Sequence, residues 1–116
     1  MTAYICMIDL KSDARALGFA AALDGWMTLL RDAGRIEAWR LMRRKLNLAG
    51  DDFSDFLLEV TVQDLSQLEA AFRFLGSADD EARQRYDRMN QHIARVRYAL
   101  YRPFPDPERV ERLTLV

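Results

Sequence analysis

Two neighbouring segments that alternate apolar and polar residues constrain most strongly how this chain folds. Residues 53–62 place Phe56, Leu58, Val60 and Val62 on one face, and residues 36–46 also alternate in a way that suits a half-buried β-strand. The residues between them include Ala-Gly-Asp-Asp, which favours a turn. A helix is the alternative for 36–46, since Arg, Leu and Met are good helix formers. We predict a strand there, because an acidic partner segment follows the turn.

The charges of the two segments predict how they pair. The first is basic and the second acidic, and a hairpin in which Arg40 faces Glu59 also brings Arg44 opposite Asp55. Opposite charges across strands stabilise a sheet by roughly 0.2–1 kcal/mol per pair. In this register one face is mostly apolar and is expected to pack under helices. The other face is mixed and comprises Ala38, Arg40, Met42, Arg44, Asp55, Leu57, Glu59 and Thr61.

The chain before this hairpin shows a strand signal and then a helix signal. Residues 4–10 are short and apolar and predict a buried strand. Apolar residues then recur at helical spacing over residues 16–30. Ser12 and Asp13 can cap this helix, and Gly34 can end it.

The second helical region is expected to be split in two. Asp64 and Gln67 form a capping-box-like start, and Gly76 and Ser77 then interrupt the apolar stripe. Ser77 can cap a further helix. Residues 95–101 alternate as a final strand.

The resulting order, β-α-β-β-α-β, predicts an α+β fold of the ferredoxin-like type. In this arrangement a four-stranded antiparallel sheet carries helices on one face only. The chain has 116 residues, which fits a single domain, and we place that domain at residues 1–102. Residues 103–116 are expected to form a tail that packs on the domain or on a dimer partner, since the end of the tail is apolar.

Composition argues against several classes of protein. Lys and Arg number 17 against 18 Asp and Glu, so the chain lacks the positive field that nucleic-acid binding needs. The open face of the third strand, which carries Asp55, Leu57, Glu59 and Thr61, also lacks the aromatics with which RNA-recognition sheets stack bases. The single Cys6 excludes a disulfide framework, and we expect no metal site. Without a long apolar run or a basic N-terminus, the chain is expected to be cytoplasmic and to bind no membrane.

The sheet face without helices predicts a homodimer. Met42, Leu57 and either Met7 or Cys6 would be exposed together there, and such an apolar patch usually marks an interface. Most soluble oligomers are two-fold dimers. We therefore expect a second copy to cover this face, and a solvated face with ordinary ion pairs is the alternative.

The element order, the length and the open sheet face resemble the dimeric α+β barrel superfamily, over roughly residues 4–102. Its members include stress-responsive barrel proteins and antibiotic-biosynthesis-type monooxygenases, in which two ferredoxin-like protomers pack sheet to sheet. The resemblance implies a dimer that binds a small, partly apolar molecule between sheet and helices. The alternative that it implies is a monooxygenase or isomerase on the same scaffold, and the cofactor is unknown. Some of these oxygenases use an Asn, a Trp and a His together, whereas the expected first strand contains no Asn.

Three residues are candidates for catalysis. His92 is the only histidine and titrates near neutral pH, so it can act as a base or a proton relay. A surface histidine near a helix C-terminus is the alternative. Glu59 needs a partner if it faces a closed barrel, and Arg40 is that partner. For this pair, a purely structural ion pair is the alternative.

Bulky residues with polar handles are candidates for lining a ligand pocket. Tyr4 belongs to this group, and core or interface packing is the alternative for each member. Cys6 is expected to be an inert buried thiol. The main pocket candidates are Trp26, Trp39, Met42, Tyr98 and Tyr101.

Overall fold

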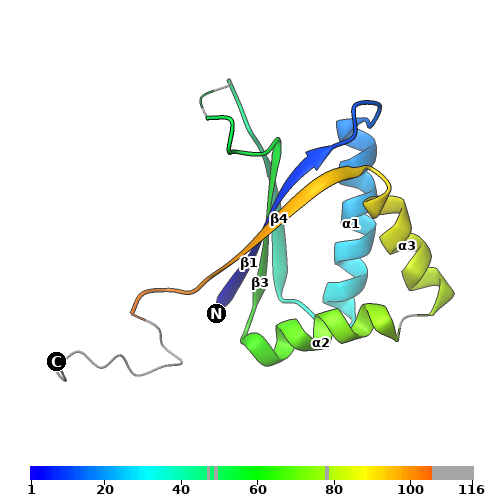
Figure 1. Cartoon of the computed structure of the whole chain (residues 1–116). Helices are drawn as coiled ribbons and strands as arrows, with labels where there is room; N and C mark the ends of the chain where they lie inside the picture. Colours follow the sequence, from blue (N-terminus) through cyan, green and yellow to red (C-terminus); the bar gives the residue numbers. More distant parts are fainter. Residues whose placement is uncertain (47, 49, 78, 106–116) are drawn as a thin grey trace.

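The computed structural model describes residues 1–46, 48, 50–77 and 79–105, and it confirms the predicted order of elements. The split of the second helical region is also confirmed. Most of the predicted tail, residues 106–116, lies outside the described residues, so the domain boundary at 102 stays a prediction. The elements are β1 (Thr2–Leu10), α1 (Ala16–Asp32), β2 (Ala38–Arg43), β3 (Phe56–Val62), α2 (Leu65–Gly76), α3 (Asp80–Asn90) and β4 (Ile93–Tyr101) (Figure 1).

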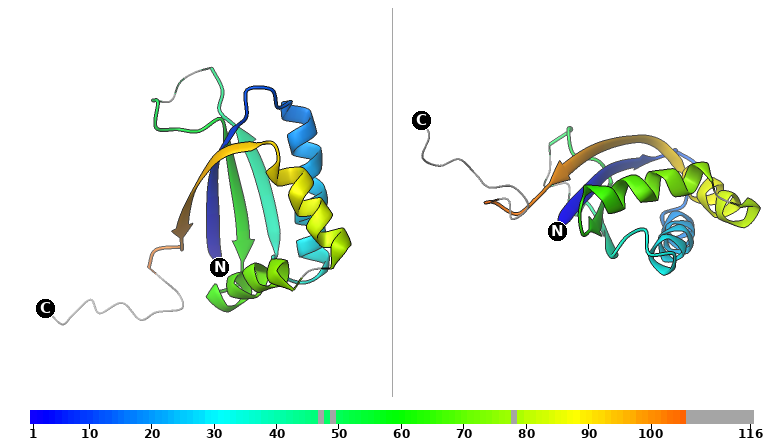
Figure 2. Two further views of the ribbon diagram at one scale, coloured as in Figure 1. Left: turned by 45° about the vertical axis from the view of Figure 1, so that its right-hand side comes forward. Right: turned by 90° about the horizontal axis from the view of Figure 1, so that it is seen from below.

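The four strands form one antiparallel sheet in the order β2-β3-β1-β4. The sheet is curved, and all three helices lie on its concave side (Figure 2). This is the predicted ferredoxin-like α+β arrangement, and none of the helices in the described residues lies on the opposite face of the sheet. Within the described part of the chain, no helix is long and apolar enough to cross a membrane.

The pairing of β2 with β3 has the register that the charges predict. Arg40 lies opposite Glu59, and Met42 lies opposite Leu57. Beyond the end of β2, the Arg44 backbone N–H donates to the Asp55 carbonyl at 2.8 Å and extends the pairing. The period of two along each strand then decides which side chains face the helices.

Two helix starts differ from the prediction. Ser12 and Asp13 lie in a turn closed by the Ala14 N–H and the Lys11 carbonyl, and α1 begins after Arg15, without a side-chain cap. Ser77 caps no helix start, because its N–H bonds back to carbonyls at the end of α2. The cap of α3 is Asp79, whose carboxylate accepts from the Ala82 N–H at 2.9 Å. Asp79 lies closer to the first turn of α3 than Ser77 does, and it takes the N-cap role that the sequence predicts for Ser77.

The predicted start of α2 and the predicted end of α1 are confirmed. Asp64 accepts from the Gln67 N–H at 2.8 Å. Gly34 has a φ of 73°, and the Arg35 N–H reaches back to the Leu30 carbonyl at 2.8 Å. This pattern of bonds is a Schellman motif, in which a residue with positive φ closes the helix.

The core lies between the helix-facing side of the sheet and the three helices, and α1 contributes most of its helical residues. Cys6 is part of this core, whereas Met7 points to the opposite face, so of the two it is Met7 that belongs to the open side of the sheet. The buried core comprises Cys6, Ile8, Phe19, Leu23, Trp26, Met27, Leu30, Ile36, Phe56, Leu58, Val60, Val62, Leu68, Ala82 and Met89.

Candidate functional site

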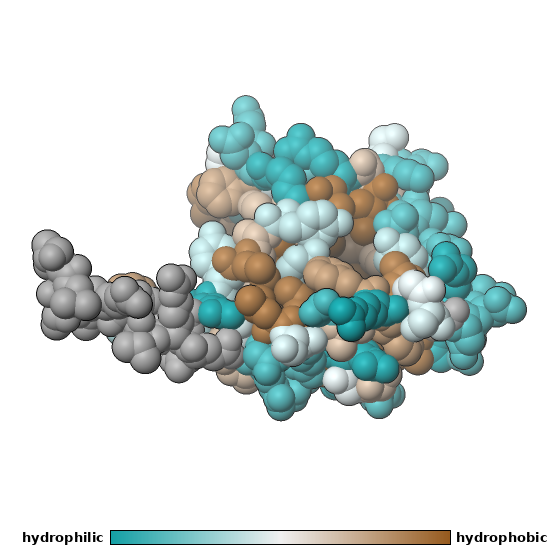
Figure 3. Space-filling model, turned by 60° about the horizontal axis from the view of Figure 1, so that its bottom comes forward, coloured by the Kyte–Doolittle hydropathy of each residue, from teal (hydrophilic) through white to brown (hydrophobic). Residues whose placement is uncertain are grey.

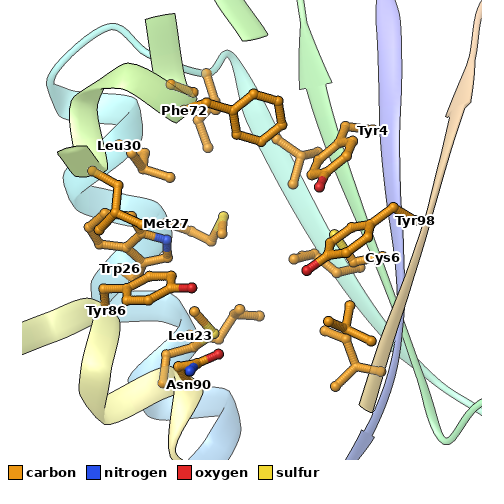
Figure 4. A pocket seen from close by; sticks show the side chains of 18 of the residues that line it. Tyr4, Cys6, Leu23, Trp26, Met27, Leu30, Phe72, Tyr86, Asn90 and Tyr98 are labelled. Atoms are coloured by element: carbon orange, nitrogen blue, oxygen red, sulfur yellow. The ribbon is translucent and has the colours of Figure 1, made fainter. Parts of the chain in front are cut away.

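A cavity of about 320 Å³ lies between the sheet and the helices. Its walls come from the helix-facing side of β1, β3 and β4 and from the inner faces of α1, α2 and α3. The helices α1 and α3 pack on each other, and the cavity lies between them and the sheet (Figure 4). Most of the lining is apolar: Ile8, Leu23, Met27, Leu30, Ile36, Leu58, Val60, Leu68, Ala71, Phe72, Leu75, Met89, Ile93 and Val96.

Polar groups reach the cavity from both walls. In Figure 4 the hydroxyl groups of Tyr86 on α3 and Tyr98 on β4 point toward one another across the space. The indole nitrogen of Trp26 also faces the cavity from α1. The cavity is therefore an apolar space with a small number of hydrogen-bonding groups, which is the usual construction of a small-molecule site. The polar lining residues are Tyr4, Cys6, Trp26, Tyr86, Asn90 and Tyr98.

Aromatic rings form the mouth of the cavity on the sheet side. Tyr4 stacks on Tyr98, with centroids 5.6 Å apart and an interplanar angle of 8°. Tyr4 also meets Phe72 of α2 edge to face, at 5.6 Å. Phe72 is 57% exposed and Tyr98 is 61% exposed, so both also border solvent. Apolar side chains surround a hollow on the face of the molecule that presents α2 (Figure 3).

The helix wall is built around Trp26. This residue is only 5% exposed and meets Tyr86 edge to face, with centroids 5.4 Å apart. It also packs against Phe74 of α2, with ring centroids 6.3 Å apart. Arg85 of α3 donates to the Gly25 carbonyl of α1 at 3.3 Å and so ties the two helices together. Trp26 thus joins all three helices at the cavity.

The titratable groups of the sheet wall hold their protons. Burial raises the pKa of the Cys6 thiol to about 12. Burial also raises the pKa of Tyr4, and the neighbouring Cys6 raises it further. The pKa of Tyr98 is raised by burial first and then by Cys6 and Tyr86. These groups are neutral hydrogen-bond donors at physiological pH, and the thiol is not a nucleophilic thiolate.

The structure places the predicted pocket residues on three different surfaces. Trp26 and Tyr98 line the cavity. Trp39 faces the helices but lies at the edge strand β2, where the Arg31 guanidinium covers its ring at 5.0 Å. Met42 and Tyr101 lie on the opposite, open face of the sheet. Of the five predicted residues, the structure therefore brings only two together at the cavity.

The predicted catalytic residues lie outside the cavity. His92 occupies the turn between α3 and β4, where its ring meets Phe19 edge to face at 6.3 Å. Arg40 and Glu59 lie on the open face and pair at 3.1 Å between Nη2 and Oε2. Glu59 also borders a shallow hollow together with Tyr101. In the described part of the chain, no three His, Cys, Asp or Glu side chains gather as metal ligands.

Tyr86 and Asn90 are the polar cavity residues that the sequence analysis does not identify as pocket candidates. Both lie on α3, a strongly polar helix in which Ala82, Tyr86 and Met89 form the apolar stripe. A tyrosine in such a stripe is the one available signal, because its hydroxyl must find a polar neighbour once the ring is covered.

Comparison with solved structures supports the fold class. The chain is similar to a hydroxynitrile lyase from Passiflora edulis, at 14% identity, over 86% of this chain and 90% of that chain, with a TM-score of 0.64. It is similar to a dimeric ferredoxin-like protein of unknown function from Jannaschia sp. CCS1, at 6% identity, over 88% of this chain and 98% of that chain, with a TM-score of 0.62. It is also similar to a dabb family protein with a ferredoxin-like fold from Mesorhizobium loti, at 16% identity, over 89% of this chain and 96% of that chain, with a TM-score of 0.58.

These likenesses show the fold and confirm the resemblance to the dimeric barrel proteins. A search among curated proteins found no match to the sequence. One family matches residues 1–116, and its description is a family of unknown function, DUF6614. Because this match spans the whole sequence, the chain belongs to the DUF6614 family.

Proposed function

We propose that this protein binds a small, mostly apolar molecule in the cavity between its sheet and its helices. The observation that carries the proposal is the cavity itself, with its continuous apolar lining and its few inward-pointing polar groups. A space of about 320 Å³ corresponds to about ten water molecules at roughly 30 Å³ each. Water gains few hydrogen bonds from walls of this kind, so an apolar ligand is the better occupant.

Catalysis on the same scaffold, as a monooxygenase or an isomerase, draws less support. Such a reaction needs a base or an activating group close to the bound molecule. His92, Glu59 and Arg40 do not line the cavity, and burial keeps the Cys6 thiol protonated. The similarity to a hydroxynitrile lyase, at 14% identity, extends to the fold and identifies no shared catalytic group.

We also propose that two copies pair through the open face of the sheet. Met7, Leu57 and Met42 lie side by side across β1, β3 and β2 and are half-buried in the single chain. The Arg40–Glu59 ion pair lies next to them on the same face. An apolar strip beside paired charges suits a two-fold interface, and the similar protein from Jannaschia is described as dimeric.

Native mass spectrometry of the purified protein tests the cavity proposal. We expect extra mass that is released on denaturation, and we expect Ala71→Leu to lose it because residue 71 lines the cavity. The matched control is Ala70→Leu on the same helix, which does not line the cavity and is expected to keep the ligand. The proposal is wrong if the wild type carries no extra mass and added 2-ethylnaphthalene, an uncharged hydrocarbon probe, does not raise its unfolding temperature.

Light scattering after size exclusion tests the pairing of two chains. Leu57→Asp places a charge at the centre of the proposed interface, beside Glu59 and Asp55, and should convert the dimer to a folded monomer. Leu17→Asp is the control, because Leu17 is 86% exposed on α1. A wild-type monomer, or a Leu57→Asp dimer of unchanged stability, would contradict pairing through this face.

A further inference from the structure

The polar groups of the cavity are all uncharged, and this property restricts the ligand. Resting on the proposed function, we infer that the cavity selects uncharged molecules with a hydrogen-bond acceptor, such as aromatic ketones or aldehydes, over carboxylates of the same shape. The donors that we assign to this selection are the hydroxyls of Tyr86 and Tyr98. They point into the space from opposite walls (Figure 4).

The lining offers no countercharge to an ionised ligand. Among the described residues that border the cavity, none is Asp, Glu, Lys, Arg or His. Moving an unpaired carboxylate from water into such a space carries a large desolvation cost, whereas a carbonyl group loses much less. The raised pKa values of Tyr4, Cys6 and Tyr98 keep the wall neutral as well.

Three of the free polar groups can donate a hydrogen bond to an acceptor on the ligand. Neither the Tyr86 nor the Tyr98 hydroxyl, nor the Trp26 indole N–H, takes part in the hydrogen bonds found in the described part of the chain. The indole group can only donate, and a protonated tyrosine can donate its hydrogen to a carbonyl oxygen. A ligand oxygen in this space can therefore accept from a donor on the helix wall or from a donor on the sheet wall.

The aromatic pairs favour a flat ligand. Tyr4 and Tyr98 stack on the sheet wall, and Trp26 and Tyr86 pack edge to face on the helix wall. Ring faces and edges on both sides of a space suit another ring, which gains offset or edge-to-face contacts.

Three probes of nearly equal shape test the inference: 2-acetylnaphthalene, 2-ethylnaphthalene and 2-naphthoate. Binding to the full chain is measured by isothermal titration and by quenching of tryptophan fluorescence. The variants are Tyr86→Phe and Tyr98→Phe, each of which removes one oxygen atom. Tyr101→Phe is the control, because Tyr101 lies on the same strand as Tyr98 and on the opposite face.

We expect the ketone to bind roughly tenfold more tightly than the hydrocarbon and the carboxylate to bind most weakly. Tyr86→Phe and Tyr98→Phe should each weaken ketone binding severalfold and leave hydrocarbon binding unchanged. The control variant, Tyr101→Phe, should bind the ketone as tightly as the wild type does. If the carboxylate binds as tightly as the ketone, or if the two variants weaken ketone and hydrocarbon equally, the inference is wrong while ligand binding in the cavity stands. If none of the probes binds, including the hydrocarbon, the proposed function fails and the inference fails with it.

Discussion

Tyr4 and Tyr98 stack across the neighbouring strands β1 and β4, with ring centroids 5.6 Å apart and planes within 8° of parallel. The Cys6 thiol lies beside both rings, because Cys6 is two residues from Tyr4 and opposite Tyr98 in the sheet. Each of the three groups therefore has two weakly acidic neighbours in a partly dehydrated wall. None of them can ionise without placing a charge next to the others.

This arrangement predicts that the protein loses stability at alkaline pH. The pKa of Cys6 rises from 9.0 to about 12, and those of Tyr4 and Tyr98 are raised as well. The unfolded chain releases these protons at lower pH than the folded chain, so the folded state is favoured below pH 9 and loses stability as pH rises towards 12. For one group the loss approaches about 1.4 kcal/mol per pH unit. Urea denaturation over this pH range measures it.

Cys6→Ala provides the control for this pH dependence. Without the thiol, the ionisation of Cys6 no longer contributes to the pH dependence, and the pKa values of Tyr4 and Tyr98 are raised less. The free energy of unfolding should therefore fall less steeply with pH. The same slope in the variant and in the wild type would show that Cys6 does not hold its proton through burial.

Gly25 and Gly34 are expected to respond oppositely to substitution by alanine. Gly25 lies inside α1, and a Cβ atom there would meet no heavy atom within 4 Å. Gly25→Ala should stabilise the protein by about 0.5–1 kcal/mol, because alanine restricts the unfolded chain and favours the helix. Gly34 has a φ of 73°, so Gly34→Ala should destabilise it by about 1–2 kcal/mol. Thermal denaturation of both variants would contradict this account if the two shifts had the same sign.

Asp9 fastens the start of β3 to the end of β1. Its Oδ1 accepts from the Asp55 N–H at 3.0 Å, and its Oδ2 accepts from the Ser54 hydroxyl at 3.1 Å. Ser54 is buried, so Asp9→Ala leaves its hydroxyl without this partner, and the expected cost is about 1–3 kcal/mol. Asp13→Ala in an exposed turn is the matched control, expected to stay within about 0.5 kcal/mol of the wild type in chemical denaturation. Equal effects of the two changes would exclude the fastening role.

The sequence predicts the sheet pairing better than it predicts the helix starts. The β2–β3 register follows from charge, since sliding the strands would separate Arg40 from Glu59. A register slip by one residue would also turn every apolar side chain to the wrong face. The sequence predicts the first residue of a helix less well, because several residues near each start can serve as the N-cap. Asp79 rather than Ser77 begins α3 for this reason.

The site follows from the sequence only in part. Alternation along β4 already separates Tyr98 from Tyr101, since residues three apart in a strand face opposite sides. The position of α1 and α3 over the sheet cannot be predicted in this way, because it depends on how all the side chains pack together. The cavity, and with it the role of Tyr86, becomes visible only in three dimensions.

The two tryptophans occupy unlike surroundings, which gives the chain a built-in optical reporter. Trp26 borders the cavity against Tyr86, whereas Trp39 lies away from it under the Arg31 guanidinium. Emission from the first indole depends on what fills the cavity, and emission from the second serves as an internal reference. A Trp39→Phe chain therefore reports occupancy from a single fluorophore, without any added label.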